Sequence, residues 1–193
     1  MKPYYELEKK STIAQSLIDT AHNSSEWINY FNFKAKLVPP EILFQDEFFR
    51  WLVKRYDFIA GILKLDPYTC YDWHTDTKRG VGINMLLTPH SRSFCAFAPK
   101  KSEQVFKIEE LPYKPMTYYL FNTQVNHTVY NFETTRYLLS IEFAKEKHEL
   151  SFEDLLVDIR TQYEKIKELA TYELNKSTGE VQKVCECGVK GCD

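Results

Sequence analysis

The segment from residue 58 to residue 144 is a succession of short apolar runs that are closed by turn-forming residues. The run at 58–65, for example, is closed by Asp66-Pro67. The other runs are 81–87, 92–98, 116–121 and 136–143. Several short runs at this spacing are typical of strands in an antiparallel sandwich or barrel.

The composition agrees with a β-rich core. Of the 193 residues, 44% are hydrophobic and 27% are charged, which is the balance of a globular domain. Aromatic residues make up 15% of the chain, and such side chains pack well on pleated sheets. We therefore predict a mainly β fold with flanking helices, in one domain over residues 1–175.

Helices are predicted on both sides of this segment. Residues 11–21 form a candidate short helix, and residues 41–56 carry apolar side chains at helical spacing directly after Pro40. Ser151 is placed to cap a third helix that runs to about residue 174 and braces the outside of the sheet.

Charge and hydropathy narrow the range of partners. The formal net charge is −2, so no global charge calls for nucleic acid or an anionic membrane surface. No stretch approaches the roughly 20 apolar residues of a membrane helix, and the first ten residues contain no apolar core of a secretory signal. We expect a cytoplasmic protein without membrane or nucleic-acid partners, and the sequence leaves its oligomeric state open.

Three side chains form a candidate metal site. His74 and Asp76 are two residues apart at the end of a strand-like stretch, so both point to one face of an extended backbone. His127 lies on a later predicted strand. Two imidazoles and one carboxylate are the facial triad that holds non-haem Fe(II) and leaves three positions open. The alternative is that His74 merely ends a strand and Asp76 caps a turn.

Arg136 begins the predicted strand 136–143, on which it shares a face with Leu138 and Ser140. An arginine that faces a core is costly unless an anion pairs with it, and its fork of N–H groups matches a carboxylate. Arg136 is therefore a candidate clamp for the distal carboxylate of 2-oxoglutarate. The alternative is an edge arginine that reaches water or pairs with Glu133 or Glu142.

These residues carry a resemblance to a known family. The stretch 121–131 contains an aromatic-led turn and then His127-Thr-Val-Tyr-Asn, and it is followed by Arg136 and an apolar strand. In this pattern the chain resembles the 2-oxoglutarate- and Fe(II)-dependent oxygenases, and most closely the aspartyl/asparaginyl β-hydroxylase-like group. The resemblance covers roughly residues 58–144. It implies a double-stranded β-helix, which is a cupin-like jelly roll.

The resemblance also implies roles for individual residues. His74, Asp76 and His127 would be the iron ligands, and Arg136 would anchor the co-substrate 2-oxoglutarate. The carboxylate of Asp76 points to hydroxylation, because related halogenases carry a small residue there. Many members have a hydroxyl residue two positions after the arginine, where this chain has leucine. The other candidates for co-substrate contacts are Ser140, Asn84, Tyr118 and Tyr119.

The function that follows is an Fe(II) dioxygenase that hydroxylates a peptide side chain or a free amino acid and releases succinate and CO2. The alternative is a non-catalytic cupin-like protein that binds a metal or a small ligand.

The cysteines and Arg79 are further candidates for functional or structural roles. Cys185, Cys187 and Cys192 offer three of the four thiolates of a structural zinc site in the tail 176–193, although a tail with free thiols is the alternative. Cys70 and Cys95 are expected to be buried. Arg79 could guard the substrate mouth, but a solvated turn arginine is the simpler expectation.

Overall fold

The computed structural model describes residues 2–88, 92–101 and 106–162. The chain divides into two compact units, Met1–Leu155 and Leu156–Asp193, and both sheets belong to the first unit. Within the described residues, no helix has the length and apolar character needed to span a membrane.

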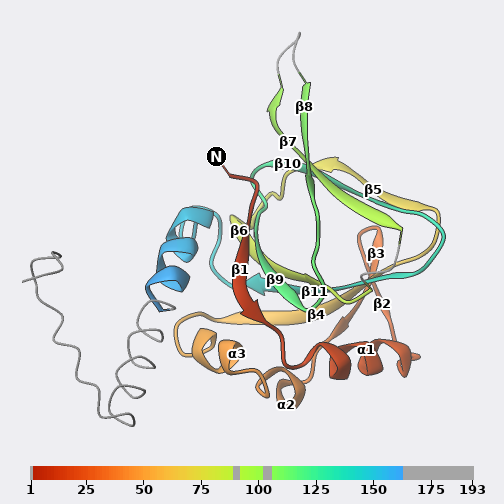
Figure 1. The fold of residues 1–193 in the computed structure, drawn as a ribbon, viewed down its shortest axis with the longest axis vertical. Coiled ribbons are helices and arrows are strands. Elements are labelled where there is room, and N and C mark those ends of the chain that lie inside the picture. Colours follow the sequence, from red (N-terminus) through yellow and green to blue (C-terminus); the bar gives the residue numbers. More distant parts are fainter. Residues whose placement is uncertain (1, 89–91, 102–105, 163–193) are drawn as a thin grey trace, which may run out of the picture. The chain divides into compact units, whose positions relative to one another are not determined.

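Two antiparallel sheets form the body of the first unit (Figure 1). The larger sheet has the strand order β1-β9-β6-β11-β4-β3-β2, and the smaller sheet has the order β5-β10-β7-β8. The strands are β1 (Tyr4–Lys10), β2 (Ile28–Tyr30), β3 (Phe33–Leu37), β4 (Phe58–Leu65), β5 (Thr69–His74), β6 (Val81–Leu86), β7 (Ser93–Lys101), β8 (Phe106–Leu111), β9 (Thr117–Asn122), β10 (Asn126–Asn131) and β11 (Arg136–Phe143). The helices before β4 are α1 (Ala14–His22), α2 (Pro40–Leu43) and α3 (Glu47–Leu52).

The strands use their two faces differently. On β11, Arg136, Leu138 and Ser140 line a pocket between the sheets, whereas Leu139 and Ile141 are buried on the opposite face. The helices lie on that outer side of the larger sheet, where the rings of Phe48 and Phe49 of α3 pack against Tyr118 of β9 (Figure 1). The predicted mainly β architecture with flanking helices is confirmed.

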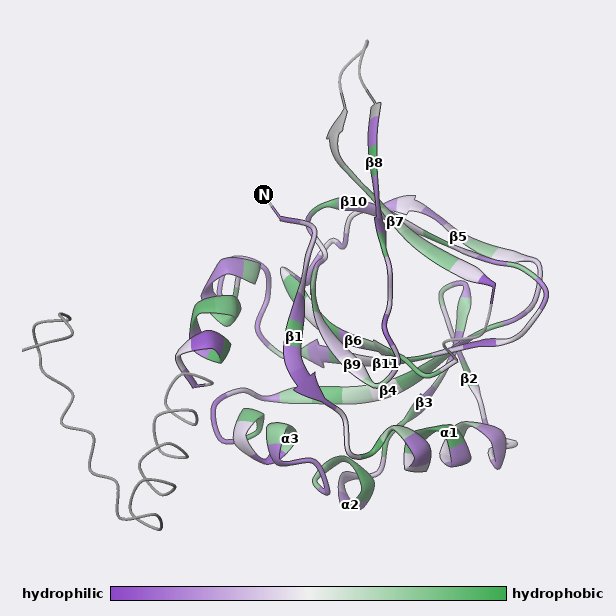
Figure 2. Cartoon of the chain, in the orientation of Figure 1, coloured by the Kyte–Doolittle hydropathy of each residue, from purple (hydrophilic) through white to green (hydrophobic). Residues whose placement is uncertain are grey.

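The helix predicted over 41–56 is two helices. Pro40 occupies the first turn of α2, as predicted, but the chain leaves the helix at Phe44. Asp46 then begins α3, because its side chain accepts a hydrogen bond of 2.9 Å from the Phe48 amide. A capping aspartate therefore divides a stretch whose apolar spacing is continuous. The predicted helix at 11–21 is present as α1, which alternates between apolar and polar residues (Figure 2).

The strands before residue 57 and β8 were not predicted. β1 reads Tyr-Tyr-Glu-Leu-Glu-Lys-Lys, and Leu7 is its one fully buried side chain, so its apolar signal is weak. β2 and β3 lie at the edge of the larger sheet and have only three and five residues, too few for a clear strand pattern. Such edge strands are specified by pairing with neighbours rather than by their own composition.

The last predicted helix begins as expected. Ser151 Oγ accepts a hydrogen bond of 3.1 Å from the Asp154 amide, and residues 152–162 are helical. The boundary between the two units falls inside this segment, so its bracing role and the single domain ending at 175 remain predictions.

Candidate metal centre and carboxylate pocket

One pocket between the two sheets brings together the residues predicted to act at the site, except Tyr118 and Tyr119. It contains about 520 Å3 of empty space, including the volume at its open mouth. Its lining includes His74, Asp76, His127, Arg136, Ser140 and Asn84. The aromatic and apolar parts of the wall come from Phe33, Leu63, Tyr71, Tyr113, Phe121, Val129 and Leu138.

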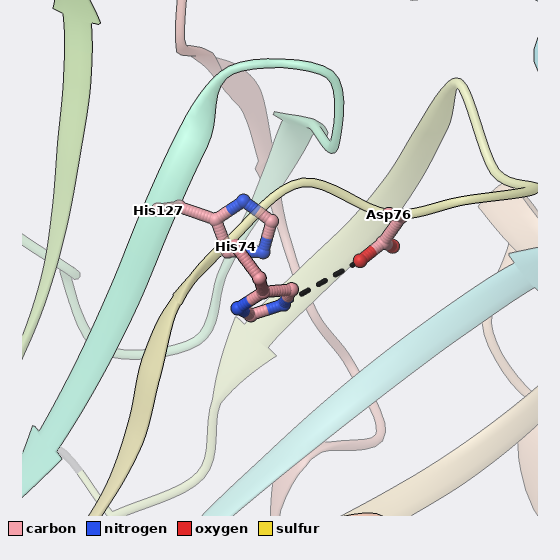
Figure 3. A group of neighbouring side chains, drawn as sticks. All are labelled: His74, Asp76 and His127. Carbon is pink, nitrogen blue, oxygen red and sulfur yellow. Dashed lines mark ion pairs between the residues drawn. The ribbon is translucent and has the colours of Figure 1, made fainter.

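The three candidate ligands come from two neighbouring strands and a turn (Figure 3). His74 ends β5 and lies directly opposite His127 of β10, and their ring centroids are 4.2 Å apart. Asp76 follows β5, and its Oδ1 is 3.5 Å from His74 Nε2. One potential ligand atom from each residue lies within 4.8 Å of the other two. Such a cluster can surround a single ion.

Backbone carbonyls fix the orientation of both imidazoles. Nδ1 of His74 lies 2.7 Å from the carbonyl oxygen of Asp72, and Nδ1 of His127 lies 2.9 Å from that of Val125. A carbonyl only accepts, so Nδ1 carries a proton in each ring, and in the neutral form of the ring Nε2 keeps its lone pair. Partners of this kind orient histidines that bind metals.

Two of the three ionisable groups in the cluster, His127 and Asp76, have pKa shifts that favour cation binding. At His74, burial is outweighed by the hydrogen bond with Asp76, which raises the pKa of that imidazole. Burial lowers the pKa of His127 to about 4, so this imidazole is neutral at physiological pH. Burial opposes ionisation of Asp76, but the hydrogen bond with His74 and the charge of Arg79 outweigh it and lower the pKa of this carboxyl. The cluster therefore offers a carboxylate and at least one neutral imidazole.

Hydrogen bonds clamp the turn that carries Asp76. The Asp76 amide donates to the Thr123 carbonyl at 3.0 Å, and Gln124 Nε2 donates to the carbonyls of Asp76 and Arg79 at 2.9 and 2.6 Å. Arg79 holds the Asp76 carboxylate itself, because its Nε and Nη2 lie 2.8 and 2.6 Å from Oδ2. The expectation of a solvated Arg79 was wrong.

Arg136 supplies a buried cation in the same pocket. Its side chain is 2% exposed, and its Nε has no hydrogen-bond partner among the described residues. The guanidinium carbon is 5.7 Å from the ring centroid of Tyr113, whose buried hydroxyl also lacks a partner there. Burial raises the pKa of Tyr113, so its hydroxyl keeps its proton. Two adjacent donors are thus left for an acceptor inside the pocket.

Polar groups on β11 and β6 complete this part of the wall. Ser140 and Asn84 are register partners and both line the pocket. Tyr118 and Tyr119 do not line it: the Tyr118 hydroxyl binds Asp46 and Ser11 on the outer side of the sheet, and the Tyr119 hydroxyl accepts from the Lys114 amide. Tyr113 was missed, because it follows β8 in a stretch without regular spacing.

The cysteine expectations had mixed outcomes. Cys95 is buried and lines the pocket, and burial raises the pKa of its thiol to about 12. Cys70 is exposed, so the prediction of its burial was wrong. The proposed zinc ligands Cys185, Cys187 and Cys192 lie outside the described residues.

Comparison with known proteins gives matches in structure only. No protein-family model and no curated protein sequence matches the chain. A prolyl-4-hydroxylase from Pseudomonas putida aligns with a TM-score of 0.56 and 14% identity, over 74% of this chain and 92% of that one. A Trichoplax adhaerens prolyl hydroxylase in complex with a peptide fragment of hypoxia inducible factor also gives 0.56, with 12% identity over 73% and 83%.

A third similar structure contains a different bound molecule. HygX from Streptomyces hygroscopicus, with nickel, 2-oxoglutarate and hygromycin B bound, aligns with a TM-score of 0.53 and 10% identity over 74% and 83% of the two chains. At these identities the likeness concerns the fold, and it confirms the jelly roll predicted from the sequence. The same fold holds a peptide fragment in one of these structures and hygromycin B in another, so the fold does not fix what this chain binds.

Proposed function

We propose that this protein is a 2-oxoglutarate-dependent Fe(II) dioxygenase that hydroxylates a peptide side chain or a free amino acid. The observation that carries the proposal is one pocket with two features: a cluster of two histidines and one aspartate, and a buried arginine with an unpartnered Nε. The proposed subgroup, the aspartyl/asparaginyl β-hydroxylase-like proteins, remains a prediction from the sequence.

The chemistry of the donor set suits Fe(II). His74 and His127 offer Nε2 lone pairs and Asp76 offers Oδ1, because the other polar atoms of these side chains are already bonded within the protein. Three ligands from one side leave positions open for a bidentate 2-oxoacid and for dioxygen. The bound iron and 2-oxoglutarate would supply dioxygen activation for hydroxylation, with release of succinate and CO2.

The charges of the pocket suit a dianionic co-substrate. Arg136 and Tyr113 present donors at which a distal carboxylate can bind, and Ser140 and Asn84 are polar groups in the same wall. A guanidinium and a carboxylate form paired, charge-assisted hydrogen bonds. Binding there would satisfy the orphaned Nε of Arg136, which otherwise carries the desolvation cost of a buried donor.

Aromatic rings limit the access of water to the candidate metal centre. Phe121 and Phe97 lie 4.9 and 5.9 Å from the His127 ring, centroid to centroid, and the Tyr71 ring lies 4.1 Å from that of His74. An enclosed, weakly polar surrounding strengthens the electrostatic contacts of bound anions and protects reactive species from solvent.

The test is succinate formation from 2-oxoglutarate by protein loaded anaerobically with Fe(II) and then exposed to oxygen. We expect turnover in the wild type and its loss in His127→Ala, with a parallel loss of bound iron. Circular dichroism of the variant controls for folding, and Asp76→Ala serves as a second ligand variant outside the strands.

Two results would contradict the proposal. A wild type that binds no iron would show that the three side chains do not act as ligands. A wild type that binds iron stoichiometrically but does not bind 2-oxoglutarate in calorimetry would indicate the alternative, a cupin-like metal-binding protein.

A further inference from the structure

The larger sheet extends past the pocket and leaves part of its inner face exposed. On this face Leu138 and Ser140 of β11 line the pocket, and their register partners on β4 are Leu63 and Gly61. The face continues through β3 and β2, which lie beside β4 at the sheet edge (Figure 1).

This exposed face is apolar. Ile28, Leu37 and Ile59 are 64%, 65% and 58% exposed, and with Ala35 and Gly61 they form what we call the shelf. They come from three adjacent strands and lie on one face, because Ile28 pairs with Ala35, Leu37 pairs with Gly61, and Ile59 is two residues before Gly61. Large exposed apolar residues gathered on one face commonly mark a binding surface.

The shelf is continuous with the candidate site. The cavity above it has about 540 Å3 of empty space and shares Leu63, Arg79 and Ser140 with the pocket that holds the metal cluster. Arg79 also grips Asp76, so the shelf begins next to a candidate iron ligand. A ligand that lies on the shelf can therefore reach the metal centre with one end.

The length of the shelf distinguishes the two substrates left open above. From β11 to β2 there are three strand spacings, or about 14 Å at about 4.8 Å each. An extended polypeptide covers that distance with about four residues at about 3.3 Å each. A free amino acid that reaches the metal cannot also cover Leu37 and Ile28.

The rim of the shelf suits a polypeptide better than an acyl chain. Glu142 accepts a hydrogen bond of 3.1 Å from the Tyr30 hydroxyl and lies 3.8 Å from Nη1 of Arg79. All three residues border the cavity above the shelf. Such groups can form hydrogen bonds with the N–H and C=O groups of a peptide. A hydrocarbon chain has no donors or acceptors for them.

We propose that the shelf binds a polypeptide substrate whose apolar residues flank the residue placed at the metal. The inference rests on the proposed function for what happens at the metal, and on Ile28, Leu37 and Ile59 for the binding itself. It excludes a free amino acid as the physiological substrate.

Gly61 offers a direct way to block the shelf. A Cβ at this position would meet only the Lys36 carbonyl oxygen, at an ordinary contact distance of 3.5 Å, so a side chain fits the backbone and projects into the shelf. Ile59→Asp makes the same surface polar. Ile108 on β8 is a matched control, because it is an isoleucine on a strand with 54% exposure, and it borders neither cavity.

The experiment compares three probes on Fe(II)-loaded protein: a pool of capped hexapeptides rich in apolar residues, a pool of polar capped hexapeptides, and a mixture of the free amino acids. The readout is the ratio of stimulated to basal succinate release. We expect the apolar pool to raise this ratio and the free amino acids to leave it unchanged. Gly61→Val and Ile59→Asp should lower the effect of the apolar pool at least tenfold, and Ile108→Asp should not.

Saturation-transfer NMR with the apolar pool measures binding without turnover. In one outcome, the wild type binds the apolar pool and yet forms no succinate. If Ile59→Asp then loses this binding, the result supports the shelf and refutes the proposed function. In a wild type that turns over 2-oxoglutarate, stimulation by free amino acids, no stimulation by any pool, or equal responses of Ile59→Asp and Ile108→Asp would overturn the inference. A dimeric wild type that Ile59→Asp converts into a monomer would also overturn it, because a second copy would then occupy the shelf.

Discussion

Asp46 and Arg136 are both charged and both buried, but their surroundings differ. Asp46 is fully buried and accepts hydrogen bonds from the Thr12 amide, the Phe48 amide and the Tyr118 hydroxyl, at 3.1, 2.9 and 2.9 Å. Lys9 Nζ lies 3.3 Å from Oδ1 of the same carboxylate. Arg136, equally inaccessible, keeps an unpartnered Nε.

The difference separates a structural charge from a binding charge. The protein satisfies Asp46 entirely by its own groups, and so this carboxylate joins α3 to the loop before α1. A buried donor without a partner costs free energy unless a ligand accepts its hydrogen bond. Under the proposed function, Arg136 is the place where the fold gives up stability in return for binding an anion.

The largest expected effect on stability comes from Asp46→Ala. It removes the acceptor of three hydrogen bonds and leaves buried donors unsatisfied. We therefore expect the free energy of unfolding, measured in urea, to fall by about 3–5 kcal/mol. Asp154→Ala is the control, because that aspartate lies in an exposed helix cap. If Asp46→Ala lowers the free energy of unfolding by less than about 1 kcal/mol, Asp46 is not the structural charge that the comparison takes it to be.

The same aspartate has a pH signature. Burial opposes its ionisation, but the hydrogen bonds from Thr12, Phe48 and Tyr118 outweigh this and lower its pKa in the folded state. Its stabilising contribution is therefore present above the unfolded pKa, about 3.9, and is lost as the pH falls through the lower folded pKa. In Asp46→Asn this part of the acid dependence should be absent from urea titrations between about pH 2 and 5.

Arg136→Met should show the opposite pattern. Removing a buried charge without a full set of partners leaves the free energy of unfolding unchanged or higher. Loss of a buried charged donor should weaken 2-oxoglutarate binding by about 2–5 kcal/mol, which is about 30-fold or more. Calorimetry with 2-oxoglutarate measures the affinity, and urea unfolding of the same sample measures the stability. A variant that unfolds easily yet binds 2-oxoglutarate normally would place Arg136 with Asp46 as a structural residue.

Arg79→Met probes a charge between these two cases, because Arg79 is paired with a candidate metal ligand, Asp76, and at a longer distance with Glu142. Losing the group that orients Asp76 should reduce the affinity for Fe(II) by about 10- to 100-fold. Arg79→Lys should recover part of it, since a lysine can reach one carboxylate oxygen but not in a fork. Arg92→Met is the control, because Arg92 forms an exposed pair with Glu133. Anaerobic calorimetry with Fe(II) that gives equal affinities for Arg79→Met and Arg92→Met would assign Arg79 no role at the metal.

The smallest expected effect is that of Tyr113→Phe. Its hydroxyl has no partner in the described protein, so the free energy of unfolding should not fall. One hydrogen bond to an anionic ligand is worth about 1.5 kcal/mol, so affinity for 2-oxoglutarate should drop about tenfold. Unchanged affinity, measured beside Tyr119→Phe, would leave Arg136 as the carboxylate anchor without this tyrosine.

The sequence was a good guide to the pocket because the pocket is built on regular strands. His74 and Asp76 could be paired from their spacing, and the shared face of Arg136 and Ser140 follows from the period of a strand. Tyr113 could not be found in this way, because it lies between β8 and β9, where no period constrains its direction. The candidates Tyr118 and Tyr119 rested on no strand register with Arg136, and alternation directs Tyr118 to the opposite face.

The division of the predicted helix at 41–56 has a related cause. Apolar spacing indicates which residues are buried but does not reveal where a polar side chain interrupts the backbone hydrogen bonding. Asp46 does so because Tyr118, 72 residues later, and Lys9 are present to satisfy it. Partners this distant are fixed by the tertiary fold, and no local pattern contains them.

The carbonyl contacts of His74 and His127 have a consequence for the order of assembly. Their Nδ1 atoms are bonded to the chain two residues earlier, and the turn of Asp76 is bonded to Thr123 and Gln124. The ordering of these groups is thus part of folding, so an ion bound as proposed would find its ligands in place and would not have to organise them. The apoprotein should therefore fold cooperatively on its own, and iron should exchange without unfolding it.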